Sequence, residues 1–241
     1  MSVQRLFRTL MCALCALIFV LNSRGPQRAA AEGTAAEPPA PEASAAQLTA
    51  AYRRMRALRP ELDTDLWELA LCGPGHPVSE PAETVRVAAV PVDARIEKDL
   101  RELLQAARNK GLSVYLSCGY IDETAAEHLY RRTVESVGEF RARTMIDRPA
   151  ENEHRSGLAV DITDRYYEEK DSSIENTELF QWLRMHSWEY GFVLRYPKDK
   201  KDITGHVFTP WHFRYVGREA AAFMAEYGLT LEEFLDLYKS G

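Results

Sequence analysis

Glu153-His154-Arg155-Ser156-Gly157-Leu158-Ala159-Val160-Asp161-Ile162 is the stretch of this 241-residue chain that decides its fold. The apolar run 158–162 predicts a strand, and alternate side chains of a strand point to opposite faces. Val160 and Ile162 therefore enter the core, whereas Asp161 points away from it. Asp161 thus faces a site that His154, on the preceding loop, can share.

A second segment, Pro210-Trp211-His212-Phe213-Arg214-Tyr215, brings another histidine into a short apolar strand. His154, Asp161 and His212 together make a three-ligand set for Zn²⁺ that leaves a fourth position for water. By spacing alone this indication is weak, because a histidine beside a tryptophan is more often packed in a core. Structural zinc sites are usually closed by four Cys or His ligands. No fourth candidate stands near either segment, so the pattern favours an open, catalytic type of site.

The residue types within the two segments point to one protein family more specifically than the spacing of the histidines and the aspartate does. His-x-x-Gly-x-Ala-x-Asp at 154–161 and Pro-Trp-His-Phe-Arg-Tyr-Val-Gly at 210–217 resemble the VanY-type D-alanyl-D-alanine carboxypeptidases, zinc peptidases with the Hedgehog/DD-peptidase fold. The resemblance runs from about Asp65 to the C-terminus. It implies that zinc activates water against the D-Ala-D-Ala amide of a peptidoglycan stem peptide. It also implies candidate substrate-binding residues, namely Tyr120, Asn152, Trp211 and Arg214.

The chain departs from the family pattern at residues that such chemistry uses. Thr209 stands where the family has its glutamate base, and general acid–base help contributes roughly 10²–10⁴-fold in rate. Ile121 stands where the family has an arginine that binds substrate or stabilises developing charge. Ala126 replaces a family glutamine, and Asn152 replaces a serine. The three metal ligands are therefore kept while the base and the arginine are lost.

Nearby charged residues are candidates for the missing roles. Glu153 adjoins a ligand and could act as the base, and Arg155 and Arg214 could bind a carboxylate. For Glu153 and Arg155 a solvated surface charge is the stronger interpretation, and Arg214 could simply brace the sheet. The leading hypothesis is a D,D-carboxypeptidase-like domain, and the rival is a non-catalytic cell-wall peptide-binding module. An endopeptidase acting on another bond of the same polymer is a third, weaker hypothesis.

The composition of the N-terminal region predicts a targeting segment rather than a part of the folded domain. Arg5 and Arg8 precede an apolar run, 10–21, which is shorter than the roughly 20 residues of a membrane span. We expect 1–31 to be a signal peptide, or an uncleaved anchor as the alternative, so that the rest of the chain is exported to the cell wall. Residues 32–44 are rich in Ala, Pro and Glu and predict a tether.

The remainder, 45–241, is long enough for a single domain with its own core. The net charge of −6 and the lack of a basic stripe argue against a nucleic-acid partner. We expect a monomer that contacts a membrane only through its N-terminus. Cys72 and Cys118 are the two cysteines outside the targeting segment, and the sequence leaves open whether they form a disulfide.

Periodicity and capping residues predict an α+β domain whose mainly antiparallel sheet is flanked by helices. Asp93, Asp122 and Thr230 are the expected helix N-caps, the last of them in a capping box with Glu233. The expected helices begin near these caps and also cover 46–58, 179–190 and 220–227. The expected strands cover 66–71, 112–118, 158–162, 192–196 and 213–216. The remaining predicted features are turns at 73–75 and 197–201.

Overall fold

The computed structural model describes residues 53–239 except 82, 168 and 169. The predicted signal segment 1–31, the tether 32–44 and the first part of the predicted helix 46–58 lie outside these described residues. Residues 53–58 of that helix are helical as expected. Within the described part of the chain, no helix has the length and apolar character that a membrane crossing requires.

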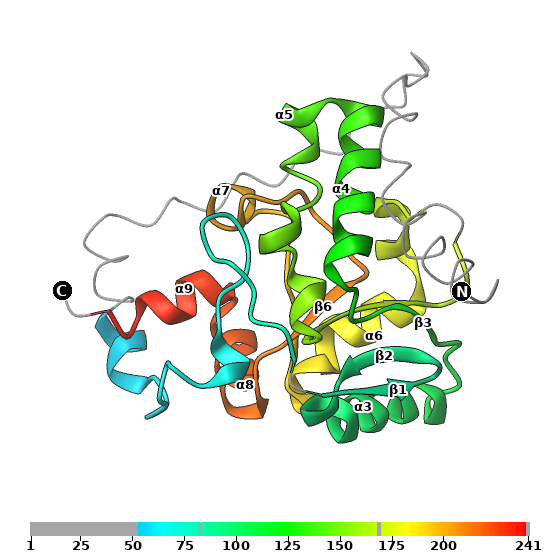
Figure 1. Cartoon of the computed structure of the whole chain (residues 1–241). Helices are drawn as coiled ribbons and strands as arrows, with labels where there is room; N and C mark the ends of the chain where they lie inside the picture. Colours follow the sequence, from blue (N-terminus) through cyan, green and yellow to red (C-terminus); the bar gives the residue numbers. More distant parts are fainter. Residues whose placement is uncertain (1–52, 82, 168–169, 240–241) are drawn as a thin grey trace, which may run out of the picture.

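The centre of the domain is a four-stranded sheet in which every neighbouring pair is antiparallel. Its strand order is β3 (Tyr115–Cys118), β4 (Ala159–Thr163), β6 (His212–Tyr215) and β5 (Phe192–Leu194). A separate antiparallel hairpin joins β1 (Thr84–Val87) to β2 (Val90–Asp93). The predicted α+β class with a mainly antiparallel sheet is confirmed (Figure 1).

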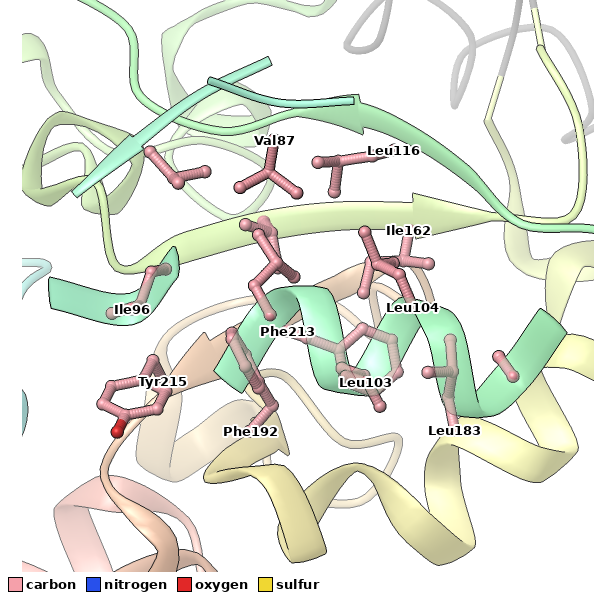
Figure 2. Close-up of a cluster of buried hydrophobic side chains, with 14 of the residues drawn as sticks. Val87, Ile96, Leu103, Leu104, Leu116, Ile162, Leu183, Phe192, Phe213 and Tyr215 are labelled. Carbon is pink, nitrogen blue, oxygen red and sulfur yellow. The ribbon is translucent and has the colours of Figure 1, made fainter. Parts of the chain in front are cut away.

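One face of the sheet is covered by helices α3 (Glu97–Asn109) and α6 (Glu178–His186). The predicted apolar stripe of α3 is confirmed, since Leu100, Leu103 and Leu104 are at most 1% exposed. Figure 2 shows these helices and the strands contributing side chains to one cluster, including Ile162 and Phe213. Each such burial is worth roughly 1.5–3 kcal/mol. Val160 joins the same cluster, so alternate β4 side chains enter the core as the sequence predicts.

The predicted caps form as expected. The Asp93 side chain accepts from the Arg95 amide and starts η2 (Ala94–Ile96), which runs directly into α3. Asp122 accepts from the Ala125 amide at the start of α4 (Glu123–Val137). Thr230 and Glu233 form both bonds of a capping box that opens α9 (Leu231–Asp236).

A second apolar cluster lies beside the sheet and holds α8 (Arg218–Tyr227) against α9. Helix α4 and the short α5 (Glu139–Ala142) project from the body of the domain (Figure 1). The other short elements described are η1 (Trp67–Leu69), η3 (Pro149–Glu151), η4 (Glu153–Ser156), η5 (Ser172–Asn176), η6 (Ser187–Tyr190) and α7 (Lys201–Thr204).

Several local predictions are wrong for identifiable reasons. The predicted strand 66–71 contains the helical turn η1 instead, because the Glu68 and Ala70 carbonyls accept from Arg214 and none of the strands described pairs with this segment. The predicted strand 112–118 begins only at 115, and the predicted turn at 197–201 leads into α7. The β1–β2 hairpin was not predicted, since its turn uses Ala88 and Ala89 at positive φ rather than glycine.

The register of the sheet places three polar side chains in a row across adjacent strands. Asp161 lies opposite His212 on β6 and opposite Cys118 on β3. Because Val160 and Phe213 face α3, their neighbours Asp161 and His212 face the other way. The face of the sheet away from α3 and α6 therefore carries the candidate site.

Gly119 is the tightest glycine of this region. A Cβ atom at Gly119 would lie 2.3 Å from the Pro91 carbonyl oxygen and within 2.9 Å of two valine side chains. We expect Gly119→Ala to lower the free energy of unfolding by about 1–3 kcal/mol, because the hairpin must move away from β3. Denaturant unfolding measures this loss.

Gly111→Ala is the matched control, since no atom lies within 4 Å of its Cβ position and only its positive φ of 80° is strained. That strain alone costs about 1 kcal/mol. A Gly119→Ala variant as stable as the unchanged protein would contradict the packing described here.

Candidate metal centre

The two strand-borne residues of the site are fixed by sheet pairing, and the third by a tight turn. Asp161 on β4 and His212 on β6 are direct cross-strand partners. His154 lies on η4, which ends at Gly157 in the left-handed region with φ of 69°. A Cβ there would meet the Asp93 amide nitrogen at 2.8 Å, so glycine is required for the chain to turn from η4 into β4.

The Asp161 carboxylate lies between the two predicted histidine ligands. Asp161 Oδ1 lies 3.4 Å from His154 Nε2 and 3.1 Å from His212 Nδ1. The two imidazole rings have centroids 4.8 Å apart and an interplanar angle of 81°. Tetrahedral zinc with bonds of about 2.0–2.1 Å separates its ligand atoms by about 3.3–3.4 Å. Asp161 Oδ1 therefore lies at about this ligand-to-ligand spacing from each of the two histidine nitrogens, and the predicted set fits zinc in its chemistry.

Hydrogen bonds on the far side of each imidazole settle which nitrogen faces the metal position. His154 Nδ1 lies 2.9 Å from the Gly119 carbonyl oxygen, which only accepts, so Nδ1 carries the proton. His212 Nε2 lies 2.9 Å from Glu153 Oε2, and the same reasoning protonates Nε2. His154 Nε2 and His212 Nδ1 are therefore the nitrogens that can bind a metal.

Glu153 is enclosed by cations and cannot be a general base. Its side chain is 1% exposed, and Oε1 accepts from Arg195 Nε at 2.9 Å and from Arg214 at 2.7 Å. Burial alone raises the pKa of Glu153, but Arg195, Arg214 and His212 outweigh it and hold the pKa well below the usual range. Both sequence-based interpretations of Glu153, as a base and as a surface charge, are wrong.

Arg214 braces the core. It is 0% exposed, and its guanidinium also donates to the Glu68 and Ala70 carbonyl oxygens. These contacts agree with the bracing role that the sequence analysis offered for Arg214, and its role in substrate binding stays a prediction. Arg155 is not a solvated surface charge either, since its side chain is 9% exposed.

A buried lysine that no sequence pattern marked completes the polar cluster. Lys170 Nζ donates to Asp161 Oδ2 at 2.7 Å, and the lysine side chain is 1% exposed. Burial alone raises the pKa of Asp161, but Lys170 and then His154 hold it well below its usual range. Asp161 thus stays ionised, with one oxygen on Lys170 and the other turned to the histidines.

Cys118 is a second site residue that sequence reasoning missed. Its thiol, a His154 nitrogen and an Asp161 oxygen all lie within 4.8 Å of one another. The only sequence indication was its position beside Gly119 at the end of a predicted strand. Cys72 and Cys118 are both buried free thiols, so the disulfide that the sequence left open does not form in this structure.

The other predicted residues take supporting positions. Asn152 accepts from the His154 amide at 3.1 Å and so caps η4. Thr209 donates its hydroxyl to the Val207 carbonyl oxygen at 3.0 Å. Trp211 is 8% exposed, and its ring centroid lies 5.8 Å from Lys170 Nζ. Tyr120 lies next to Gly119, and its hydroxyl lies 3.5 Å from a carboxylate oxygen of Glu80.

The profile of the D-alanyl-D-alanine carboxypeptidase (VanY) family matches residues 90–218. A D-alanyl-D-alanine carboxypeptidase of Enterococcus faecalis is 37% identical over 159 residues, which cover 61% of this chain and 57% of that protein. The chain thus spans about half the length of the curated relatives it matches first, 52% and 57%.

Two solved structures share the fold over their whole length. VanYB in complex with D-alanine-D-alanine has a TM-score of 0.64 and 32% identity, covering 72% of this chain and 100% of that one. A mutant of the vancomycin resistance D,D-pentapeptidase VanY in complex with Zn(II) has a TM-score of 0.63 and 32% identity, covering 70% and 99%. The Hedgehog/DD-peptidase-like fold predicted from the sequence is confirmed.

Because His212 and Cys118 flank Asp161 on opposite sides, substitution can tell which of them completes the ligand set. We expect His212→Gln to weaken zinc binding by at least about a hundredfold, and Cys118→Ser to change it by less than about tenfold. Competition with a chromophoric chelator measures both affinities. Loss of zinc in Cys118→Ser with retention in His212→Gln would assign the ligand role to the thiol.

The metal-free site should bind a proton in place of the metal. Burial alone lowers the pKa of His212, but hydrogen bonds to Asp161 and Glu153 outweigh it and raise the pKa to about 9 from 6.5. A raised pKa stabilises the fold fully below the unfolded value, so we expect metal-free protein to lose roughly 3 kcal/mol of stability as pH rises from 6.5 through about 9.

Zinc must displace that proton from Nδ1, so its apparent affinity should rise about tenfold per pH unit between about pH 7 and 8.5. Chelator competition across this range measures the slope. In metal-free His212→Gln, the fall in stability over the same range should be absent. A zinc affinity that does not change with pH would contradict the protonated bridge between Asp161 and Glu153.

Proposed function

This chain belongs to the D-alanyl-D-alanine carboxypeptidase (VanY) family, and on that premise we propose that it is an exported zinc carboxypeptidase that removes the terminal D-alanine of peptidoglycan stem peptides. The observation that carries the proposal is the position of Asp161 Oδ1 between His154 Nε2 and His212 Nδ1. The Enterococcus faecalis relative, which bears this activity in its name, and the VanYB complex with D-alanine-D-alanine support the choice of substrate.

The residues of this chain prepare the site for a metal before any metal arrives. Gly119 and Glu153 fix the tautomers of the two histidines, and Lys170 holds Asp161 so that one oxygen stays turned to them. Zinc in such a site supplies a nucleophile at neutral pH and polarises the scissile carbonyl. Preorganised ligands of this kind cost no rearrangement during turnover.

Among the residues that the structure describes, neither Thr209 nor Glu153 can take and return the proton of the attacking water. The Thr209 hydroxyl is bonded to Val207 and is no base near neutral pH, and Glu153 is enclosed by Arg195 and Arg214. General acid–base help is worth roughly 10²–10⁴-fold. We therefore propose a carboxypeptidase whose turnover is slowed by about that factor relative to relatives that carry the glutamate.

The second candidate function is a non-catalytic, zinc-containing module that binds cell-wall peptides. Thr209 and Ile121 favour it, because both positions have lost the charged group of the family pattern. Ile121 is 5% exposed and packs in an apolar cluster with Ala126 and Leu129, so its surroundings are built for a hydrocarbon side chain. The two functions share the ligand set and differ only in whether substrate is cut.

Export rests on the sequence of 1–31 and the tether 32–44, which lie outside the described residues. A tethered or secreted monomer in the cell wall would reach stem peptides, which are found outside the cytoplasmic membrane. We propose that location together with the peptidoglycan substrate. Fractionation of cells that produce the full chain locates it directly.

Restoring the base should restore the rate. We expect Thr209→Glu to raise kcat/KM for release of D-alanine from a pentapeptide ending in D-Ala-D-Ala by about 10²–10⁴-fold, because a carboxylate near the metal can accept the proton. Zinc-loaded full-length protein and an enzymatic assay for free D-alanine measure the gain.

Thr209→Gln is the matched control, since a glutamine side chain has the same length as glutamate but carries no basic group. Metal-dependent release by the unchanged protein supports the enzyme over the binding module. If neither the natural chain nor Thr209→Glu releases D-alanine, and adding Ile121→Arg does not help, the carboxypeptidase proposal is wrong. Product analysis on whole peptidoglycan distinguishes an endopeptidase.

A further inference from the structure

One oxygen of the candidate ligand Asp161 is already occupied. Lys170 Nζ donates to Oδ2 at 2.7 Å, whereas Oδ1 lies 3.1 Å from His212 Nδ1 and 3.4 Å from His154 Nε2. The Lys170 side chain is 1% exposed and that of Asp161 is 4% exposed, so little water reaches either partner. Separating a buried ion pair leaves an uncompensated charge and is strongly unfavourable. Oδ2 is therefore held by the ammonium group, and Asp161 can offer only Oδ1 to a metal.

The fold holds Lys170 in this position at both ends of its side chain. Its backbone directly precedes Asp171, which caps η5 by accepting from the Ser173 amide at 2.8 Å. At the other end, the ammonium nitrogen lies 5.8 Å from the centroid of the Trp211 ring, within the range of a cation–π contact. Trp211 is itself buried and directly precedes His212. Lys170 is thus a fixed part of the centre and not a mobile surface charge.

The same ion pair removes the negative charge that would attract a cation to this centre. Glu153, the carboxylate on the far side of one imidazole, accepts from Arg195 and Arg214. Two buried carboxylates therefore contact three cationic side chains, counting Asp161 with Lys170. These contacts leave no surplus of negative charge, so an ion that binds mainly by charge gains little here.

Most donors that remain for a metal are nitrogen or sulfur. They are His154 Nε2, His212 Nδ1, Asp161 Oδ1 and the Cys118 thiol, which lies within 4.8 Å of a His154 nitrogen and an Asp161 oxygen. Zn²⁺ accepts imidazole and thiolate ligands and is satisfied with four of them. Ca²⁺ and Mn²⁺ prefer six or more oxygen ligands, and a carboxylate can give such ions both of its oxygens. A single available carboxylate oxygen suits Zn²⁺ better than it suits these ions.

We propose that Lys170 is a positioning residue that sets the metal selectivity of this centre. By occupying Oδ2 and neutralising Asp161, it makes the site favour Zn²⁺ over oxygen-preferring dications such as Mn²⁺. The inference rests on the ligand set of the proposed function and not on cleavage, so it applies to the carboxypeptidase and to the binding module alike. A lysine with a purely structural role would affect stability and leave the ratio of the two metal affinities unchanged.

The test measures binding of Zn²⁺ and of Mn²⁺ to metal-free full-length protein. Competition with a chromophoric chelator gives the Kd for Zn²⁺, and the electron paramagnetic resonance signal of free Mn²⁺ gives the Kd for Mn²⁺. Lys170→Met keeps the hydrocarbon stem and removes both the charge and the donor. We expect it to tighten Mn²⁺ binding by about 10- to 100-fold more than Zn²⁺ binding, because Mn²⁺ can then use both oxygens of Asp161.

Lys200→Met is the matched control, because it breaks a partly buried lysine–glutamate pair that lies outside the ligand set. Lys200 Nζ donates to both oxygens of Glu233, at 2.8 Å and 2.9 Å, and the two side chains are 28% and 25% exposed. This variant should leave the ratio of the two affinities unchanged. Lys170→Ser keeps the test valid if Lys170→Met fails to fold, since its small side chain leaves room for water to pair with Oδ2. It should shift the ratio in the same direction.

The outcomes separate this inference from the proposed function. An unchanged ratio in Lys170→Met and Lys170→Ser overturns the inference even if the natural chain releases D-alanine. Loss of both ions from these two variants also overturns it, because Lys170 would then be needed to build the site. A shifted ratio without release of D-alanine supports the inference and removes the enzyme. Failure of the natural chain to bind Zn²⁺ overturns both, since both depend on the ligand set.

Discussion

The buried carboxylate of Glu153 is the interaction on which the rest of the site depends. It joins His212 to Arg195 and Arg214, and through Arg214 it reaches the carbonyl oxygens of η1. An ionised carboxylate removed from water is tolerated only when such partners surround it. The same contacts that neutralise Glu153 therefore fix the ring of His212 and tie the N-terminal part of the domain to the sheet.

Sequence reasoning found the residues whose position follows from chain-local rules. Strand alternation predicted that Asp161 leaves the core, where it faces the candidate ligand His212, and helix caps such as Asp122 follow from residue type. It failed where the partner lies far along the chain. Lys170 becomes a site residue only because the fold brings it to Asp161, and no periodicity records that contact.

The same limit explains why the charged residues were misread. Glu153 and Arg214 are 61 positions apart in the chain, and Glu153 looks like an ordinary surface charge until the sheet buries it against Arg214. The strand predicted at 66–71 failed for the same reason, since Arg214 takes the carbonyl oxygens that a neighbouring strand would need. Pairing of buried charges is a tertiary property, and residue type alone does not reveal it.

The charge balance of the centre distinguishes it from a structural zinc site. In a structural zinc site the ligands have no other partners, so the chain does not fold stably without the metal. The free energy of metal binding then contributes directly to folding. Here Lys170 already neutralises one oxygen of Asp161, and a protonated His212 bridges the other to Glu153. The metal-free protein therefore has its buried charges paired. A zinc ion that exchanges with the proton on His212 is not needed to hold the fold together. Such a site suits binding or cleavage of a peptide rather than a structural role.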